Sequence, residues 1–293
     1  MSFAGGPYLY RMSAGNRAPD KTENPYGPRR AGPNRTGLRR ETPMSDHDLS
    51  GITAIVTGAS RGFGRGIATA LSQAGTRVVG VARDGARLEE LRAQLGDGFI
   101  PVAADAADPV VAGQLIDAYR PGALVLNAGA SPLSRPLHRH TWQTFSRNWD
   151  VDVQHAFGWT REALLAPLDP GSTVIAFSSG AAINGSPLSG GYAGAKAAIR
   201  FLTAYAAAES ERNAFDIRFI AVLPQLTPAT ELGAAAVAAY AARQGADLPA
   251  FLQGMGPALT PEQVGKAIVD IVSDPALGQV AYQLSAAGLS PLG

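Results

Sequence analysis

The chain of 293 residues contains no cysteine, which excludes disulfide bonds, thiolate zinc sites and iron–sulfur clusters. No apolar run approaches the roughly 18 residues that a membrane-spanning helix needs, and no segment resembles the apolar core of a signal peptide. We therefore expect a soluble, cytoplasmic protein. The histidines His138, His140 and His155 have no supporting donors at metal-ligand spacing, so we interpret them as surface or loop residues and predict no metal site.

Residues 1–43 differ in composition from the rest of the chain. They are rich in Gly, Pro, Arg and Asn and carry eight basic and three acidic residues, whereas the remainder carries 17 basic and 21 acidic ones. The overall charge of +1 thus combines a basic arm of +5 with a domain of −4. Such an arm buries too little surface to offset its ordering entropy, so we expect it to be disordered and inert, with Met44 a plausible natural start. A nucleic-acid or membrane-surface role for the arm is the alternative, and we predict neither partner.

The remaining residues, 44–293, alternate strand-like and helical patterns. This alternation predicts one α/β domain, a Rossmann-like doubly wound parallel sheet of about seven strands with helices on both faces. Ligands of such sheets bind beyond the carboxyl ends of the strands. The expected strands are 52–57, 77–82, 99–103, 123–127, 172–178, 217–223 and 280–284, and the expected helices are 62–74, 85–95, 108–119, 141–166, 190–212 and 261–273.

Lysine is scarce as well, with three residues (Lys21, Lys196 and Lys266) against 22 arginines. A lysine kept in such a chain suggests a need for a compact ammonium. Tyr192 precedes Lys196 by four residues, so the two side chains share one face of a helix. An ammonium about 4 Å from a phenol favours the phenolate by roughly 4 kcal/mol at an effective dielectric near 20, which suits general acid/base work at neutral pH. A half-buried aromatic beside a solvated amine is the ordinary alternative.

Glycines follow the first expected strand directly. Gly58, Gly62 and Gly64 separate the β-branched run 53–57 from a helical pattern that extends to Ala74. Glycines at a strand-to-helix turn let the backbone approach a pyrophosphate, to which the helix N-terminus offers free N–H groups. The spacing G-x-x-x-G-x-G differs from the Rossmann fingerprint G-x-G-x-x-G, so a simple tight loop is the alternative.

The order and spacing of four motifs resemble the short-chain dehydrogenase/reductase family. The motifs are Thr57-Gly58-x-x-x-Gly62-x-Gly64, Asn127-Ala128-Gly129, Ser179 and Tyr192-x-x-x-Lys196, and the resemblance extends from Leu49 to the C-terminus. It implies an oxidoreductase that transfers hydride between a nicotinamide cofactor and a carbonyl or alcohol substrate. By this resemblance Tyr192 is the general acid/base, Lys196 assists it and binds the nicotinamide ribose, and Ser179 holds the substrate oxygen.

The resemblance also implies NADP(H) as the cofactor. At the end of the second expected strand, where an acidic residue would bind a ribose 2′-hydroxyl, the chain has Arg83. Arg61, before the middle glycine, is a second guanidinium suited to a 2′-phosphate. A solvated Arg83 next to Asp84 is the alternative. Thr230 is an alternative to Thr227 as a cofactor residue. Asp105 could instead cap the helix that follows it, although Asp108 suits that role better. The expected cofactor residues are Gly58, Ser60, Arg61, Gly62, Phe63, Gly64, Arg83, Asp105, Ala106, Asn127, Ala128, Gly129, Tyr192, Lys196, Pro224 and Thr227.

Two positions depart from the family pattern. Asp152 takes the place of an asparagine that, in the family, organises a water linking the lysine to solvent. We count Asp152 among the catalytic residues, because a carboxylate can bind this water and attract Lys196; the alternative is that it blunts the ammonium's influence on Tyr192. Gln225 replaces the glycine after Pro224, which costs the loop conformational freedom and could place an amide near the substrate.

The substrate is expected to be a small and fairly apolar carbonyl or alcohol. Apolar residues between Pro224 and Thr260 favour this view, although helix packing explains them equally well: Leu226, Leu232, Tyr240, Leu248, Phe251, Leu252 and Met255. On the resemblance we expect a homodimer or homotetramer formed through the helices around 141–166 and 190–212. The alternative function is an NADP(H)-binding sensor or regulator with weak or no activity, suggested by Asp152 and Gln225.

Overall fold

The computed structural model describes residues 48–292. The expectation of a disordered arm over 1–43 lies outside the described residues. Among those that are described, no helix combines the length and apolar character required to cross a lipid bilayer.

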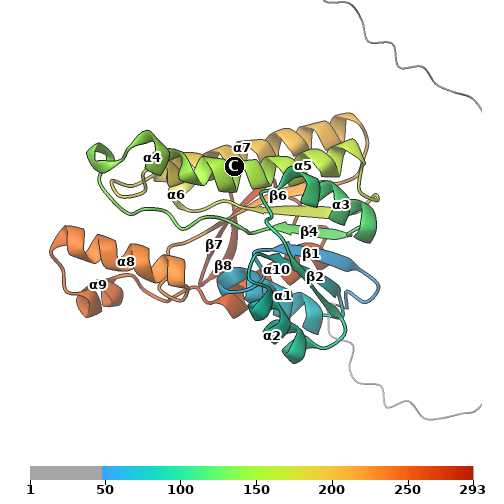
Figure 1. The fold of residues 1–293 in the computed structure, drawn as a ribbon, viewed down its shortest axis with the longest axis horizontal. Helices are drawn as coiled ribbons and strands as arrows, with labels where there is room; N and C mark the ends of the chain where they lie inside the picture. Colours follow the sequence, from blue (N-terminus) through green and yellow to red (C-terminus); the bar gives the residue numbers. More distant parts are fainter. Residues whose placement is uncertain (1–47, 293) are drawn as a thin grey trace, which may run out of the picture. The chain divides into compact units, whose positions relative to one another are not determined.

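The centre of the domain is one eight-stranded sheet (Figure 1) with the order β3-β2-β1-β4-β5-β6-β7-β8. The first seven strands are parallel, and β8 pairs antiparallel with β7. The doubly wound sheet is confirmed; the additional strand is a four-residue hairpin partner that the sequence pattern did not indicate. The strands are β1 (Thr53–Thr57), β2 (Arg77–Ala82), β3 (Phe99–Ala103), β4 (Ala123–Leu126), β5 (Thr173–Phe177), β6 (Arg218–Pro224), β7 (Ala281–Ser285) and β8 (Gly288–Pro291).

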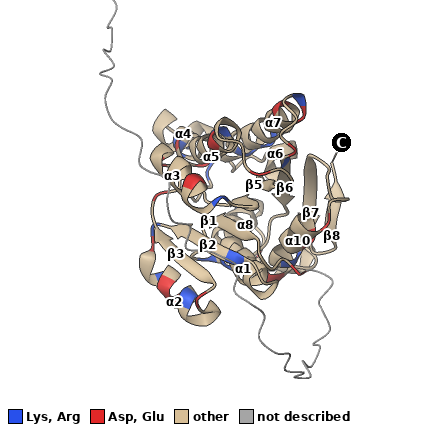
Figure 2. Cartoon of the chain, turned by 90° about the vertical axis from the view of Figure 1, so that its right-hand side faces the viewer, with Lys and Arg blue, Asp and Glu red and all other residues tan. Residues whose placement is uncertain are grey.

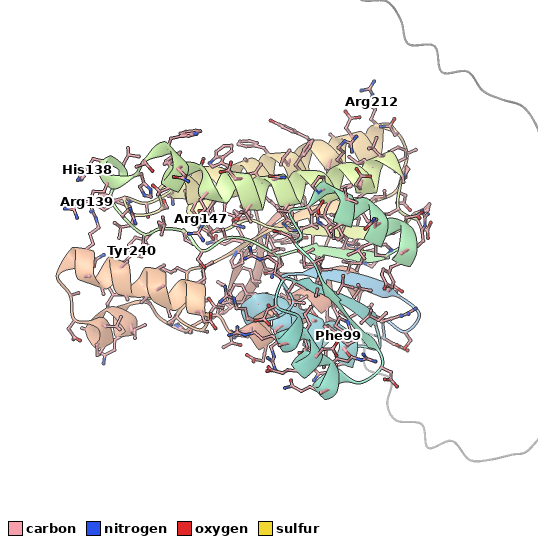
Figure 3. The ribbon with its side chains drawn as sticks, viewed as in Figure 1. Phe99, His138, Arg139, Arg147, Arg212 and Tyr240 are labelled. Carbon is pink, nitrogen blue, oxygen red and sulfur yellow. The ribbon has the colours of Figure 1, made fainter. Side chains whose placement is uncertain are left out.

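Helices cover both faces of the sheet, because successive strand side chains point to opposite sides. In β1, Val56 belongs to a core with α1, α2 and α10, whereas the adjacent Ile55 belongs to a core with α3, α5 and α7. Phe99 of β3 is buried in the first of these layers (Figure 3). The covering helices are α1 (Gly62–Gln73), α2 (Gly85–Leu95), α10 (Pro261–Ser273), α3 (Pro109–Tyr119), α5 (Gln154–Leu165) and α7 (Gly191–Arg212).

Helices α1 and α10 approach each other closely through two glycines. A Cβ at Gly265 would lie 2.5 Å from the carbonyl oxygen of Gly66, and one at Gly66 would lie 2.3 Å from that of Pro261. Both distances are shorter than real contacts, so this helix crossing requires residues without side chains.

The single helix expected over 141–166 is divided. It consists of α4 (Trp142–Asn148), a π-helical turn (Trp149–Val153) and α5. A π-helical turn inserts an extra residue and re-aims the side chains around it, and such turns are frequent at functional sites. Here the turn contains Asp152.

Two helices, α8 (Glu231–Gln244) and α9 (Leu248–Gly254), extend away from the sheet and are drawn in orange in Figure 1. They follow β6 and contain most of the apolar residues for which substrate contact and helix packing were the alternatives. Two short turns, Leu137–Arg139 and α6 (Ala181–Asn184), complete the described elements near this end of the domain.

Candidate active site

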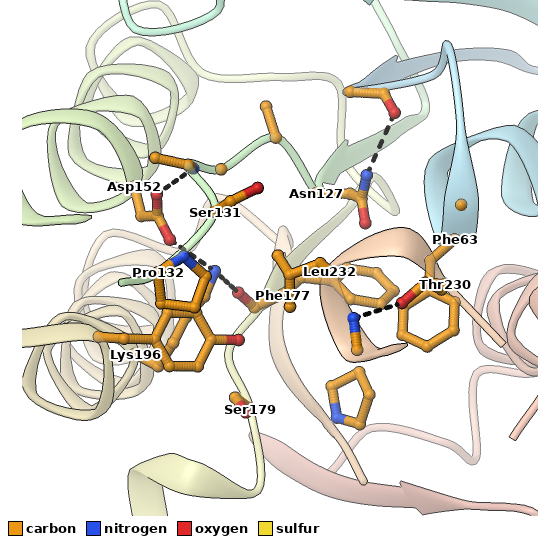
Figure 4. Close-up of a pocket in the computed structure, with 18 of the residues that line it drawn as sticks. Phe63, Asn127, Ser131, Pro132, Asp152, Phe177, Ser179, Lys196, Thr230 and Leu232 are labelled. Atoms are coloured by element: carbon orange, nitrogen blue, oxygen red, sulfur yellow. Dashed lines mark hydrogen bonds and ion pairs between the residues drawn. The ribbon is translucent and has the colours of Figure 1, made fainter. Parts of the chain in front are cut away.

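A cavity of about 790 Å³ lies at the carboxyl edge of the sheet (Figure 4). Its walls come from the segments that follow β1, β4, β5 and β6, and from α7 and α8. Parallel strands end at the same edge, which is why motifs far apart in the sequence meet there. Of the predicted site residues, all except Gly64 line this cavity.

The glycine turn after β1 is braced by the segment after β4. Gly58 and Gly62 have positive φ angles of 69° and 54°, which residues with a side chain rarely adopt. The hydroxyl of Thr57 accepts hydrogen bonds from the backbone N–H groups of Asn127 and Ala128 at 3.0 and 3.1 Å, and the Asn127 amide donates to the Thr57 carbonyl at 3.1 Å. Asn127 therefore holds the turn in shape while it lines the cavity.

Gly64 has a packing role instead of a cavity position. A Cβ at this residue would lie 2.1 Å from the carbonyl oxygen of Gly58. Because Gly64 has no side chain, the first turn of α1 can pack directly against the residue that follows β1. Gly64 thus supports the shape of the glycine turn without lining the cavity.

The two serines after β5 both line the cavity but make different contacts. The Ser178 hydroxyl is buried and donates to the backbone carbonyl of Lys196 at 2.7 Å, so it ties β5 to α7. Ser179 is half-buried and lines the cavity, with its hydroxyl accepting from the N–H of Ala181 at 3.2 Å. Its hydroxyl proton is free of this contact and can be offered to a bound oxygen.

Tyr192 and Lys196 lie on α7 and both line the cavity. The Lys196 ammonium is buried, 5.7 Å from the centre of the Tyr192 ring, and donates to the carbonyl of Phe177 at 3.0 Å. The two side chains thus lie in one compartment, as the helical spacing predicted.

Asp152 forms a buried ion pair with Lys196, with 3.2 Å between Oδ2 and Nζ (Figure 4). Its other oxygen, Oδ1, accepts from the N–H of Ala130 at 2.7 Å. Burial disfavours the ammonium, but the charges of Asp152 and Tyr192 outweigh this, so the pKa of Lys196 is raised above its ordinary value. Gly129 makes room for the pair, because a Cβ there would lie 3.0 Å from the carboxylate.

The interpretation of His155 as a surface or loop residue was wrong. His155 is on the inward face of α5, only 2% exposed, and lines the cavity. Burial and the nearby Lys196 charge, only partly opposed by a backbone hydrogen bond at Ala128, lower the pKa of His155 to about 3. His155 lies one helical turn after Asp152, and that spacing was the available signal. Within residues 48–292, no group of three His, Cys, Asp or Glu residues is arranged to hold a metal ion.

Arginines gather at the opposite end of the cavity. Arg61 and Arg83 line it as expected, and Arg87 of α2 lines it as well. Arg87 lies in the first turn of α2, four residues after Arg83, which precedes the helix, so the sequence pattern did not place the two together. Figure 2 shows basic positions on α2 and near α1.

The remaining polar candidates are largely engaged with the backbone. Asp108 caps α3, whereas Asp105 accepts from the N–H of Ala107 at 3.0 Å and lines the cavity. The buried Thr227 hydroxyl donates to the carbonyl of Leu259 at 2.8 Å, and Thr230 caps α8. The Gln225 amide donates to the carbonyl of Pro257 at 3.2 Å, so it fastens the loop.

The part of the cavity lined by α8 and the loop before it, where the sequence favoured a substrate site, is partly apolar. Leu226, Leu232 and Tyr240 line it, whereas the other apolar residues expected there, Leu248, Phe251, Leu252 and Met255, do not. Three of these lie on α9, which is one helix further from the sheet edge. The Tyr240 hydroxyl on α8 (Figure 3) hydrogen-bonds the Ser186 hydroxyl across the cavity.

Curated relatives match over part of their length. The chain is 33% identical over 145 residues to a probable NADP-dependent dehydrogenase of Haemophilus influenzae. This match covers 48% of this chain and 55% of that protein. It is 33% identical over 132 residues to D-erythrulose reductase of Gallus gallus (44% and 53%), and 34% over 106 residues to L-xylulose reductase of Homo sapiens (36% and 43%). The chain thus matches about half the length of these relatives.

A solved structure shows the same fold along nearly its whole length. It is 3-ketoacyl-(acyl-carrier-protein) reductase from Brucella melitensis complexed with NADH, which aligns with a TM-score of 0.67 and 24% identity over 81% of this chain and 98% of that one. The family model for short chain dehydrogenases matches residues 52–241, which is well over half of the chain. The protein therefore belongs to the short-chain dehydrogenase/reductase family of oxidoreductases.

Proposed function

We propose that the protein is an NADP(H)-dependent oxidoreductase that interconverts a small carbonyl compound and its alcohol. The observation that carries this proposal is the grouping of Ser179, Tyr192 and Lys196 on one cavity whose far wall is a glycine turn at a helix N-terminus. Hydroxyl, phenol and ammonium are the groups needed to hold a carbonyl oxygen and to move a proton to it.

In the proposed reduction, the Ser179 hydroxyl orients the substrate carbonyl by hydrogen bonding to its oxygen. Tyr192 gives its phenolic proton to that oxygen as negative charge develops there. NADPH, when bound, supplies hydride to the carbonyl carbon. Lys196 stays protonated and stabilises the phenolate that Tyr192 becomes, while Asp152 and the Phe177 carbonyl hold the ammonium in place.

The residues around the cavity fit a dinucleotide with a 2′-phosphate. The turn with Gly58 and Gly62 offers backbone N–H groups to a pyrophosphate, and the ends of β2 and α1 bring Arg83 and Arg61 to one part of the cavity. Guanidinium groups match phosphate in charge and geometry. The names of two relatives, the NADP-dependent dehydrogenase and Carbonyl reductase [NADPH] 2 of Sus scrofa, support the same cofactor for this chain.

We also propose a homo-oligomer formed through α5 and α7. Phe157 of α5 and the stacked rings of Phe201 and Tyr205 on α7 are all more than half exposed. Large apolar groups grouped on a protein surface commonly mark an interaction site.

Absorbance at the NADPH band, recorded against a panel of small ketones and hydroxyketones, tests the proposed activity. Tyr192→Phe should abolish turnover while NADPH binding, followed by its fluorescence, is retained. Tyr119→Phe, at the end of α3 and outside the cavity, is the matched control and should leave the rate unchanged. Tight NADPH binding without turnover of any carbonyl, and without an effect of Tyr192→Phe, would instead favour a cofactor-binding sensor.

A further inference from the structure

The carboxylate of Glu231 lies between two arginines at the basic end of the cavity. Its Oε2 pairs with Nη1 of Arg61, and its Oε1 lies 3.6 Å from Nη1 of Arg87. All three residues line the cavity. Each carboxylate oxygen therefore faces a different guanidinium, so one anion bridges the start of α1 and the first turn of α2.

The position of the Glu231 carboxylate, between the guanidinium groups of Arg61 and Arg87, would also suit a phosphate group. Two guanidinium groups converging on one anion bind a phosphate through paired, charge-assisted hydrogen bonds. Arg87 is kept in position by Asp84, whose Oδ2 lies 3.4 Å from Nε and whose Oδ1 accepts from the Arg87 N–H at 3.1 Å. Arg83 also lines the cavity near the start of α2, but among residues 48–292 the ion pairs of Glu231 are with Arg61 and Arg87.

Glu231 is also the first residue of α8, and α8 forms the opposite wall of the cavity. Its cap, Thr230, lies over the glycine turn, because a Cβ built at Gly62 would be 3.6 Å from the Thr230 methyl group. Further along α8, Leu232 and Tyr240 line the substrate end. The Arg61–Glu231–Arg87 bridge thus links α8, on the proposed substrate side of the cavity, to α1 and α2, on the proposed cofactor side.

We propose that Arg87 belongs to the 2′-phosphate site together with Arg61, and that Glu231 is an internal competitor for that site. Binding of NADP(H) then requires the 2′-phosphate to displace the Glu231 carboxylate, which releases the start of α8 from α1 and α2. NADH has no 2′-phosphate and does not compete with Glu231. This inference rests on the proposed function, because it concerns the cofactor of the same site.

The competition is expected to be modest in size. The three side chains are 43% to 63% exposed, and ion pairs that are this exposed to water are weak. Removing the Glu231 charge should therefore tighten NADPH binding by roughly three- to tenfold, since affinity scales with the fraction of protein in the binding-competent state.

Equilibrium binding of NADPH, NADH and 2′,5′-ADP to the full chain, measured by calorimetry, tests the proposal. Glu231→Gln should tighten NADPH and 2′,5′-ADP and change NADH affinity by less than about twofold. Arg87→Gln should weaken NADPH several-fold and leave NADH unchanged. The matched controls, Glu262→Gln on α10 and Arg92→Gln on α2, are exposed residues outside the cavity and should change neither affinity.

The double variant Glu231→Gln/Arg87→Gln separates competition from simple repulsion. If Glu231 competes through Arg87, its removal should improve NADPH binding less in the Arg87→Gln background than in the wild type. Equal improvement in both backgrounds, or unchanged NADPH affinity in Glu231→Gln, would overturn the inference while leaving the proposed oxidoreductase intact. Failure of wild-type protein to bind any of the three nucleotides would overturn the proposed function as well.

Discussion

The buried Asp152–Lys196 pair makes a strong prediction about stability. Asp152 is 1% exposed, and its carboxylate lies 3.2 Å from an ammonium whose side chain is 7% exposed. In Asp152→Ala, Lys196 keeps one described hydrogen-bond acceptor, the carbonyl of Phe177 at 3.0 Å, and the N–H of Ala130 loses the oxygen to which it donates at 2.7 Å. The variant therefore leaves a buried charge without its counter-ion.

The cost can be estimated from this geometry. Removing one member of a buried ion pair destabilises a protein by about 3–5 kcal/mol. At about 2–4 °C per kcal/mol for a domain of this size, the melting temperature should fall by roughly 6–20 °C. Asp152→Asn keeps an acceptor for the Ala130 N–H, so its unfolding free energy and melting temperature should fall less than those of Asp152→Ala.

Thermal and urea unfolding followed by circular dichroism at pH 7 measure these changes. Lys196→Met removes the buried cation. The double variant Asp152→Ala/Lys196→Met should therefore lose less unfolding free energy than the two single variants lose together. Lys266→Met is the matched control, because Lys266 is 72% exposed in its pair with Asp270 and should contribute less than about 1 kcal/mol. An Asp152→Ala variant within about 1 kcal/mol of wild type, or strictly additive losses, would refute the reasoning.

Two further predictions concern pH and packing. His155 binds a proton near pH 3 in the folded protein and near pH 6.5 when unfolded, so acidification below about 6.5 favours unfolding. Relative to His155→Asn, wild-type protein should lose about 1.4 kcal/mol of unfolding free energy per pH unit between pH 6 and 4, as measured by urea titrations. Gly265→Ala should lower the unfolding free energy by about 1–3 kcal/mol, because its Cβ would overlap the Gly66 carbonyl. Gly254→Ala, which meets nothing within 4 Å, should be nearly neutral, and equal effects of the two alanines would contradict the packing argument.

The parts of the fold that follow from local pattern were predictable. The seven parallel strands are short apolar runs with helical patterns between them, and the order of such runs restricts the topology strongly. The position of Ser179 on the cavity also follows from its place directly after β5, because ligands of such sheets bind beyond the carboxyl ends of the strands. The sequence did not indicate that Ser178 donates to the backbone carbonyl of Lys196.

Features that depend on tertiary contacts were not predictable. The strand β8 has four residues and exists because β7 offers it an edge. The π-helical turn around Asp152 breaks a pattern that is periodic in the sequence, and it accompanies the burial of a carboxylate against Lys196. The burial of His155 and the meeting of Glu231 with Arg61 depend on how elements far apart in the chain approach each other.

The charges in the cavity divide it into two ends with different chemistry. At the end with Tyr192, the charges of Lys196 and Asp152 offset each other, and the lowered pKa keeps His155 uncharged at neutral pH. Because the pKa of Lys196 is raised, its ammonium stays charged there. At the other end, the guanidinium groups of Arg61, Arg83 and Arg87 share the cavity lining with the carboxylates of Asp84, Asp105 and Glu231. The proposed 2′-phosphate site therefore depends on where these arginines are placed, and not on an excess of positive charge in the cavity.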